Sequence, residues 1–187
     1  ISHSYFPDWF LCFSDYWKYN LEKLLPLNSE RIISFGFPYV NSTYKRVLNN
    51  DQSIQYLKYK KVILILSQPH IAEKLVKFVL KLVPKIDSET KILFKPHPLE
   101  YKNKENYFSK LRANSILIPN QSTSIENLFE ISNYQLGVYS TAIYEGLDYG
   151  LPTYILNIKG SEFMYSLIKL GYAKLISNTV SLILKLK

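Results

Sequence analysis

The hydrophobic positions of the chain fall into short continuous runs that alternate with segments of helical spacing. Residues 61–67 contain a purely apolar run, Val62 to Leu66, which is typical of a strand buried on both faces. Residues 71–83 follow with apolar residues three or four positions apart, the spacing of one helix face. Together the two segments predict a β-strand followed by an α-helix.

The same alternation continues to the end of the chain. Further strands are expected at 91–94, 115–118, 134–139, 153–157 and 173–176. Helices are expected between them at 105–111, 125–129, 140–149 and 162–170. Repeated strand–helix units of this length predict an α/β fold with a Rossmann-like, doubly wound parallel sheet that helices cover on both faces.

The N-terminal part of the chain carries two more strand patterns. Residues 8–13 and 31–35 predict strands, and 14–24 predicts a helix between them. After these elements we expect a helix or an irregular segment to about residue 49, and then a linker at 50–53. This part of the sequence therefore continues the strand–helix alternation but is set apart from the rest by a linker.

The first candidate site is the segment Lys95-Pro96-His97-Pro98-Leu99-Glu100, directly after a predicted strand. Ligands of such sheets bind at the carboxyl ends of the strands, which is where this segment falls. A histidine between two prolines is held on a stiff backbone that fixes where the imidazole points. We take Lys95, His97, Pro98 and Glu100 as candidates for contacting a phosphate or a base. A proline-rich turn with an incidental histidine is the alternative.

The second candidate site opens a predicted helix, again directly after a strand. Ser140 and Thr141 stand at the helix start, where free backbone N–H groups and the positive end of the helix dipole favour an anion. Glu145 follows one turn later, and its carboxylate can accept hydrogen bonds from ribose hydroxyls. An ordinary serine cap of the helix is the alternative reading.

A third strand-to-helix turn is Ser67-Gln68-Pro69-His70. Ser67 and the start of the following helix can face the same cleft as the first two candidates, because all three turns follow strands of one parallel sheet. A plain helix cap explains the same residues, so both readings stay open.

Composition and charge narrow the classes of protein. Hydrophobic residues make up 47% and charged residues 20% of the chain, which excludes a disordered protein. The net charge of +8 favours anionic partners, although a well-solvated lysine-rich surface explains it equally. The basic residues are scattered singly, so we expect no nucleic-acid partner.

The sequence lacks the residues that several kinds of chemistry require. The one cysteine, Cys12, can form neither an internal disulfide nor a cysteine zinc site and fits a small buried apolar role. Ligand spacing for a metal is absent, and no glycine-rich phosphate loop or nucleophile elbow occurs. We therefore expect no metal and no cofactor. The cysteine content fits a reducing, cytosolic compartment.

The two main motifs resemble those of a known group of enzymes. Lys95-Pro96-His97-Pro98, followed by Ser140-Thr141, Glu145 and Gly150-Leu151-Pro152, resembles the C-terminal half of GT-B-type bacterial surface-polysaccharide transferases. These include capsule polysialyltransferases and related sialyltransferases, Kdo transferases of capsule assembly and teichoic acid glycerophosphotransferases. Their His-Pro motif and later Ser/Thr motif hold a cytidine nucleotide, although the polysialyltransferase pattern has a longer serine run.

The resemblance implies a domain organisation. Residues 8–18 and 32–38 look like the crossover between the two Rossmann-like domains of these enzymes. We therefore expect residues 1–50 to be the interdomain crossover and the end of an N-terminal domain, and 51–187 to be the nucleotide-sugar-binding domain. The acceptor site and the catalytic base of GT-B enzymes usually belong to the N-terminal domain. The chain is thus expected to be an inactive piece of a longer enzyme.

The resemblance also implies an activity and roles for the candidate residues. The expected reaction is transfer of a sugar from a nucleotide donor, CMP-linked, to a surface glycan or a lipid-linked acceptor. His97 is the expected catalytic residue, contacting the donor phosphate or stabilising the leaving nucleotide. Ser140 and Thr141 bind phosphate, Glu145 binds the ribose, and Ser67 and Lys95 complete the nucleotide site. The alternatives are an enzyme of the UDP-N-acetylglucosamine 2-epimerase type and a non-catalytic scaffold of a capsule-assembly complex.

The charge generates a prediction about membranes. We expect the intact enzyme to associate peripherally with the cytoplasmic face, because each basic residue near an anionic bilayer contributes about 1 kcal/mol. The alternating apolar and basic residues of 182–187 fit an amphipathic element, or else the last helix of the domain. Co-sedimentation with liposomes should increase with anionic lipid and fall with salt. Equal recovery in the supernatant under all conditions contradicts the prediction.

Overall fold

The computed structural model describes residues 6–36, 59–102 and 105–186. The chain divides into two compact units, Ile1–Lys45 and Arg46–Lys187. The segment and the linker predicted for residues 37–53 lie outside the described residues. The assignment of 1–50 to a crossover and of 51–187 to a nucleotide-sugar-binding domain therefore stays a prediction.

The first unit is a small strand–helix–strand arrangement. β1 (Phe10–Cys12) pairs in parallel with β2 (Ile32–Ser34), and α1 (Asp15–Leu24) and the 3₁₀ turn η2 (Ser29–Arg31) lie between them in the chain. The Arg31 guanidinium donates hydrogen bonds to the carbonyl oxygens of Asp8, at 2.8 Å, and Pro7, at 2.6 Å. Cys12 is buried, as expected for a small apolar residue.

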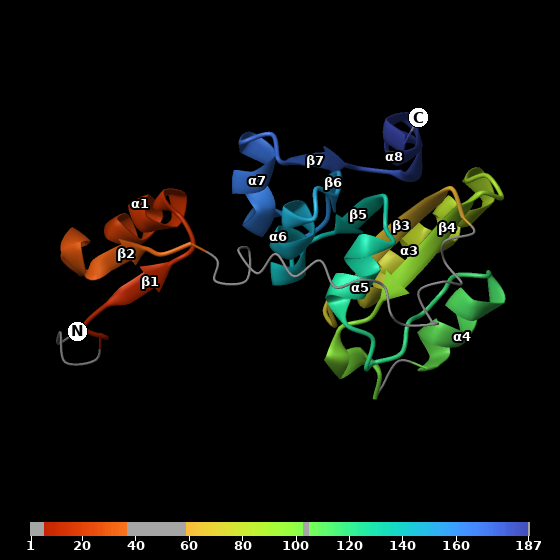
Figure 1. Cartoon of the computed structure of the whole chain (residues 1–187), viewed down its shortest axis with the longest axis horizontal. Coiled ribbons are helices and arrows are strands. Elements are labelled where there is room, and N and C mark those ends of the chain that lie inside the picture. Colours follow the sequence, from red (N-terminus) through yellow and green to blue (C-terminus); the bar gives the residue numbers. More distant parts are fainter. Residues whose placement is uncertain (1–5, 37–58, 103–104, 187) are drawn as a thin grey trace. The chain divides into compact units, whose positions relative to one another are not determined.

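The second unit is built on a parallel sheet of five strands among the described residues. The strands are β3 (Lys61–Leu66), β4 (Thr90–Lys95), β5 (Tyr134–Gly137), β6 (Thr153–Leu156) and β7 (Ala173–Ile176). Their order across the sheet is β4-β3-β5-β6-β7, and every pairing is parallel (Figure 1). The chain moves outward from β3 first to one edge and then to the other, which is the doubly wound topology.

Helices cover both faces of this sheet. α3 (Ala72–Leu82), α4 (Glu105–Ala113) and α8 (Thr179–Leu186) pack on one face, where Ile63 and Ile65 of β3 point. α5 (Ile125–Glu130), α6 (Thr141–Asp148) and α7 (Tyr165–Lys169) pack on the other, where Val62 and Leu64 point. Short 3₁₀ turns complete the series at η3 (Val83–Lys85), η4 (Pro98–Glu100) and η5 (Ser161–Met164). The predicted α/β, Rossmann-like fold is confirmed.

The helices were also compared with the requirements for crossing a membrane. No helix in the described ranges combines the length and the apolar character that crossing a bilayer requires.

The strand predicted at 115–118 forms only a single parallel bridge, between Leu93 and Leu117. Phe94 N–H donates to the Leu117 carbonyl at 2.8 Å, and Leu117 N–H donates to the Ile92 carbonyl at 3.1 Å. The pairing cannot extend because a helix-terminating turn precedes it and Pro119, which lacks an N–H donor, follows it. The segment nevertheless lies beside β4, where the outermost strand of a doubly wound sheet is expected.

The turn before this bridge contains a strained residue. Ser115 ends α4 with a φ of 59°, its N–H bonded to the Arg112 carbonyl at 2.9 Å and that of Ile116 to the Leu111 carbonyl at 3.0 Å. This is a Schellman motif, in which the left-handed position is usually glycine. α7 ends with the same pair of hydrogen bonds and carries Gly171 at that position.

We therefore expect Ser115→Gly to raise the free energy of unfolding by about 1 kcal/mol, because glycine adopts a positive φ without the steric penalty of a side chain. Urea denaturation measures the change. Gly171→Ser is the matched control and should lower stability by a similar amount, since a Cβ at Gly171 meets no atom within 4 Å and only the backbone conformation is affected. A loss of stability in Ser115→Gly contradicts the strain argument.

Candidate functional site

A pocket of about 280 Å³ opens at the carboxyl ends of β3 and β4 and at the start of α6. β3 and β5 are neighbours in the sheet, but the chain leaves them toward opposite edges, so the loops that follow them separate there. The lining residues are Leu66, Ser67, Gln68, Lys95, Pro96, His97, Pro98, Ile125, Ser140, Thr141, Ala142 and Glu145. Seven of the eight residues singled out from the sequence are thus brought together, and Glu100 is the exception.

Glu100 lies behind the pocket rather than in its lining. Its side chain is buried, and one carboxylate oxygen accepts a hydrogen bond from the Ser67 hydroxyl at 3.0 Å. The other accepts the backbone N–H of His97 at 2.6 Å. The carboxylate therefore connects the end of β3 to the loop after β4 and positions Ser67 and His97.

The turn around His97 fixes its imidazole. Nδ1 of His97 accepts the backbone N–H of Leu99 at 3.2 Å, and the Glu100 N–H donates to the His97 carbonyl at 2.8 Å. Pro98 occupies the first position of η4, where a missing N–H costs nothing. Because the Nδ1 lone pair is occupied, the neutral ring carries its proton on Nε2. His97 can then donate a hydrogen bond to an anion.

The start of α6 forms a second wall of the pocket. The Ser140 side chain caps the helix by accepting the Ala142 N–H at 3.3 Å. Thr141, the first residue of the helix, is exposed and lines the pocket beside it. The positive end of the helix dipole and the hydroxyl of Thr141 are therefore available to a negatively charged group.

Lys95 supplies the cationic side chain of the site. Its Nζ donates to the Thr123 carbonyl at 3.2 Å and lies 5.7 Å from the ring centroid of Tyr101. Burial lowers the pKa of Lys95. An anion in the pocket would offset the desolvation of this ammonium, since an opposite charge favours the protonated form.

Glu145 is the one carboxylate in the lining, one turn into α6. Burial and, secondarily, the charge of Glu126 raise the pKa of Glu145. Hydrogen bonds donated by neutral hydroxyl groups stabilise the charged form of a carboxylate in such surroundings. This is the chemistry that a ribose diol offers.

The sequence alone did not identify all of the lining residues. Gln68 belongs to the Ser67-Gln68-Pro69-His70 turn and had a signal in the sequence, whereas Ile125 did not, because α5 approaches the pocket only through the tertiary fold. His70 ends the same turn but lies outside this pocket. In the described residues, no three His, Cys, Asp or Glu side chains gather closely enough to hold a metal ion.

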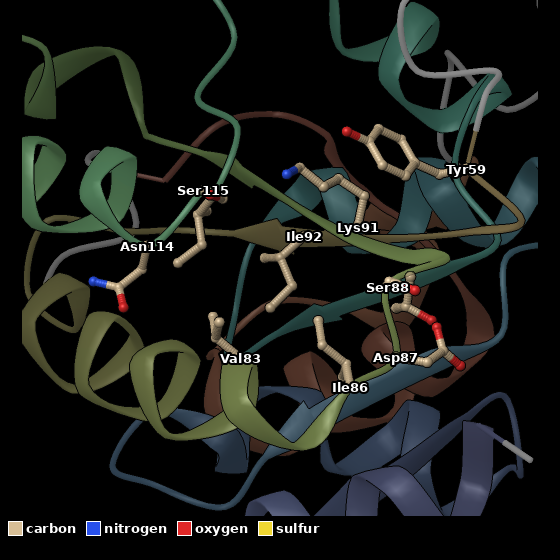
Figure 2. Close-up of a pocket in the computed structure, with 11 residues that line it drawn as sticks. Tyr59, Val83, Ile86, Asp87, Ser88, Lys91, Ile92, Asn114 and Ser115 are labelled. Carbon is tan, nitrogen blue, oxygen red and sulfur yellow. The ribbon is translucent and has the colours of Figure 1, made fainter.

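A larger cavity, of about 360 Å³, lies at the opposite edge of the sheet. Figure 2 shows Val83 and Ile86 on the segment after α3, and Asn114 and Ser115 after α4, around Lys91 and Ile92 near the start of β4. This is the amino edge, where doubly wound sheets do not bind their ligands. The single bridge at Leu117 leaves the outer edge of β4 unpaired near its start, so we assign the cavity to incomplete strand pairing on that side.

Comparison with known proteins finds solved structures of similar fold. No protein-family model and no curated protein sequence matches the chain. Among solved structures, UDP-GlcNAc 2-epimerase of Methanocaldococcus jannaschii, in complex with UDP-GlcNAc and UDP, matches with a TM-score of 0.72 and 17% identity over 94% of this chain and 52% of that one.

Two further solved structures have a similar fold. The wall teichoic acid polymerase TagF matches with a TM-score of 0.59 and 17% identity, over 96% of this chain and 48% of that one. The C-terminal CMP-Kdo binding domain of WaaA from Acinetobacter baumannii matches with 0.52 and 13%, over 71% of this chain and 83% of that domain. The chain therefore has the Rossmann-like fold of GT-B enzymes, and it spans about half the length of the first two structures.

The raised pKa of Glu145 predicts how stability depends on pH. Between the ordinary glutamate value of 4.5 and the raised pKa, the folded state binds more protons than the unfolded state, so stability falls as pH rises through this window. Glu145→Gln removes the titration. We expect this variant to be more stable than the wild type near neutral pH and to lose its advantage below 4.5.

Thermal unfolding of both proteins across pH measures this difference. Glu126→Gln should act in the same direction but more weakly, because the charge of Glu126 is the lesser cause of the shift. A Glu145→Gln variant that is less stable than the wild type at neutral pH would show that the carboxylate stabilises the fold.

Proposed function

We propose that the chain is the nucleotide-sugar-binding domain of a metal-independent glycosyltransferase that uses a CMP-linked donor and extends a surface glycan. One observation carries the proposal. His97, Lys95 and the start of α6 line one pocket, where the loops that follow β3 and β5 separate. All three favour a negatively charged group. The WaaA domain, a structural neighbour, binds CMP-Kdo, which supports a cytidine nucleotide.

The pocket suggests how a nucleotide would lie. Its phosphate would face the start of α6, with the Thr141 hydroxyl and helix N–H groups as donors. Nε2–H of His97 would donate to a second phosphate oxygen, and Lys95 would balance the remaining charge. The ribose hydroxyls would then reach Glu145, one turn along the helix.

The same groups would assist the transfer step. When the bond between the sugar and the phosphate oxygen breaks, its electron pair stays on that oxygen and the leaving phosphate gains negative charge. Donors that are already oriented stabilise this charge without rearranging. The hydrogen bonds from Leu99 to Nδ1 and from the His97 N–H to Glu100 hold His97 in that orientation.

An epimerase remains the second candidate, because the match to a UDP-GlcNAc 2-epimerase has the higher TM-score. Removing and returning a proton on a sugar needs acid–base groups beside it. The lining offers one carboxylate and one imidazole, Glu145 and His97. Product analysis of the whole enzyme separates the two functions, since an epimerase yields free or nucleotide-linked sugar and a transferase yields an elongated glycan.

Titration calorimetry with CMP, CDP, UDP and GDP tests the nucleotide site and its base preference. We expect cytidine nucleotides to bind most tightly. His97→Asn should weaken this binding by roughly tenfold, because an asparagine oxygen can still accept the Leu99 N–H and keep the turn while the imidazole donor is lost. In the whole enzyme this variant should lose most activity, whereas a non-catalytic scaffold would keep its function.

A matched pair of helix caps separates binding from folding. Ser140→Ala and Ser124→Ala each remove a serine cap, and Ser124 accepts the Asn127 N–H at 3.4 Å at the start of α5 outside the lining. Both should destabilise the fold by about 1 kcal/mol. Only Ser140→Ala should also weaken nucleotide binding. Equal affinities in the two variants, or no nucleotide binding to the intact enzyme, would overturn the proposal.

A further inference from the structure

A second cavity, of about 420 Å³, opens at the same carboxyl edge of the sheet. It is lined by the segment that starts α3, by Tyr139 after β5, and by Lys159, Gly160, Glu162 and Phe163 after β6. Residues close together in the sequence line the two cavities. Tyr139 and His70 line this cavity, whereas Ser140 and Gln68 line the nucleotide pocket. The two cavities are therefore lined by neighbouring segments of the chain.

The lining carries an excess of positive charge. Lys74 and Lys159 both contribute to it and are exposed. The described ion pairs join Lys60 to Glu89 and Lys77 to Glu73, so neither lysine of the cavity has a carboxylate partner among the described residues. The acidic residue of the lining, Glu162, is directed to the backbone instead, where its carboxylate accepts the Gly160 N–H at 2.7 Å.

The start of α3 adds to this positive potential. Ile71 occupies the capping position, and no side chain caps the first turn of the helix. By contrast, Ser140 caps α6 beside the nucleotide pocket. The uncapped N–H groups of α3 and the positive end of its dipole therefore reinforce Lys74, which lies in the first turn.

An aromatic wall stands beside the charges. The rings of Tyr139 and Phe163 meet edge to face, with centroids 5.8 Å apart, and Phe163 keeps 61% of its surface exposed. Gly160, with a φ of +103°, lies against Tyr139 so closely that a Cβ would come within 2.5 Å of its ring. The loop after β6 is thus held in place, and it presents an apolar face next to cationic groups.

We propose that this cavity binds an acidic glycan unit, with its carboxylate or phosphate at Lys74 and Lys159 and its ring against Phe163. The inference rests on the proposed function, because it assigns the part of the substrate beyond the nucleotide. An anionic unit fits better than a neutral one, since the lining carries two ammonium groups against one carboxylate and neither lysine forms an ion pair among the described residues. The unit belongs either to the donor sugar or to the glycan that accepts it.

NMR titration of the ¹⁵N-labelled chain tests the site directly. Glucuronate and glycerol 3-phosphate are the probes, and glucose and glycerol are their uncharged controls. We expect the backbone amides of Lys74, Tyr139 and Gly160 to shift with the charged probes and not with the neutral ones. The effect should weaken with salt, because the lysines are exposed. Equal shifts with glucose and glucuronate would overturn the proposal.

Charge-neutralising variants provide the second arm. The double variant Lys74→Gln with Lys159→Gln should weaken glucuronate binding by roughly tenfold or more. Lys77→Gln is the matched control on the same helix, because Lys77 pairs with Glu73 and does not line the cavity, and its affinity should equal that of the wild type. A double variant that binds like the wild type contradicts the site. If its binding weakens, an unchanged melting temperature shows that unfolding is not the cause.

Competition measurements distinguish the donor sugar from the acceptor glycan as the ligand of this cavity. They also distinguish the acidic site from the proposed nucleotide site. A nucleotide-linked sugar acid that displaces glucuronate, when the nucleotide alone does not, assigns the cavity to the donor sugar. Persistent glucuronate binding with the donor bound assigns it to the acceptor. If nucleotides leave the Ser140 amide unmoved while glucuronate still shifts Gly160, the nucleotide proposal fails and the acidic site stands.

Discussion

The geometry of the site depends on the hydrogen bonds that the buried carboxylate of Glu100 accepts. A carboxylate removed from water is costly unless its oxygens are hydrogen-bonded, and here they accept the Ser67 hydroxyl and the His97 N–H. These two donors belong to the ends of adjacent strands. The penalty for separating them therefore holds the two loops together, and the imidazole of His97 keeps its place at the rim of the pocket.

The sheet topology determines where a ligand can enter. β3 and β5 lie side by side, but the chain leaves them in opposite directions, so the crevice between their loops is not filled by a connecting segment. α6 starts at this crevice, with its positive end toward it. The cavity at the amino edge is larger than the pocket at the start of α6 but has no comparable helix start, so size alone does not identify the site.

The two cavities at the carboxyl edge share the Tyr139–Ser140 connection but differ in chemistry. The pocket at the start of α6 combines hydrogen-bond donors with one half-buried carboxylate, Glu145, whose pKa is raised by burial and by the charge of Glu126. The neighbouring cavity combines exposed lysines with aromatic rings. A substrate with a nucleotide at one end and an acidic sugar at the other would satisfy both sets of groups.

The sequence by itself determined the order of strands and helices, because the apolar runs and helical spacings of residues 61–176 are local patterns. It also indicated the His97 turn and the start of α6, since both directly follow strands. Only the tertiary structure decided that Glu100 supports the pocket from behind, that Ile125 lines it, and that 115–118 makes a single bridge. These outcomes depend on contacts between segments far apart in the chain. A local pattern of residues does not predict which side chains such contacts bury or which hydrogen bonds they form.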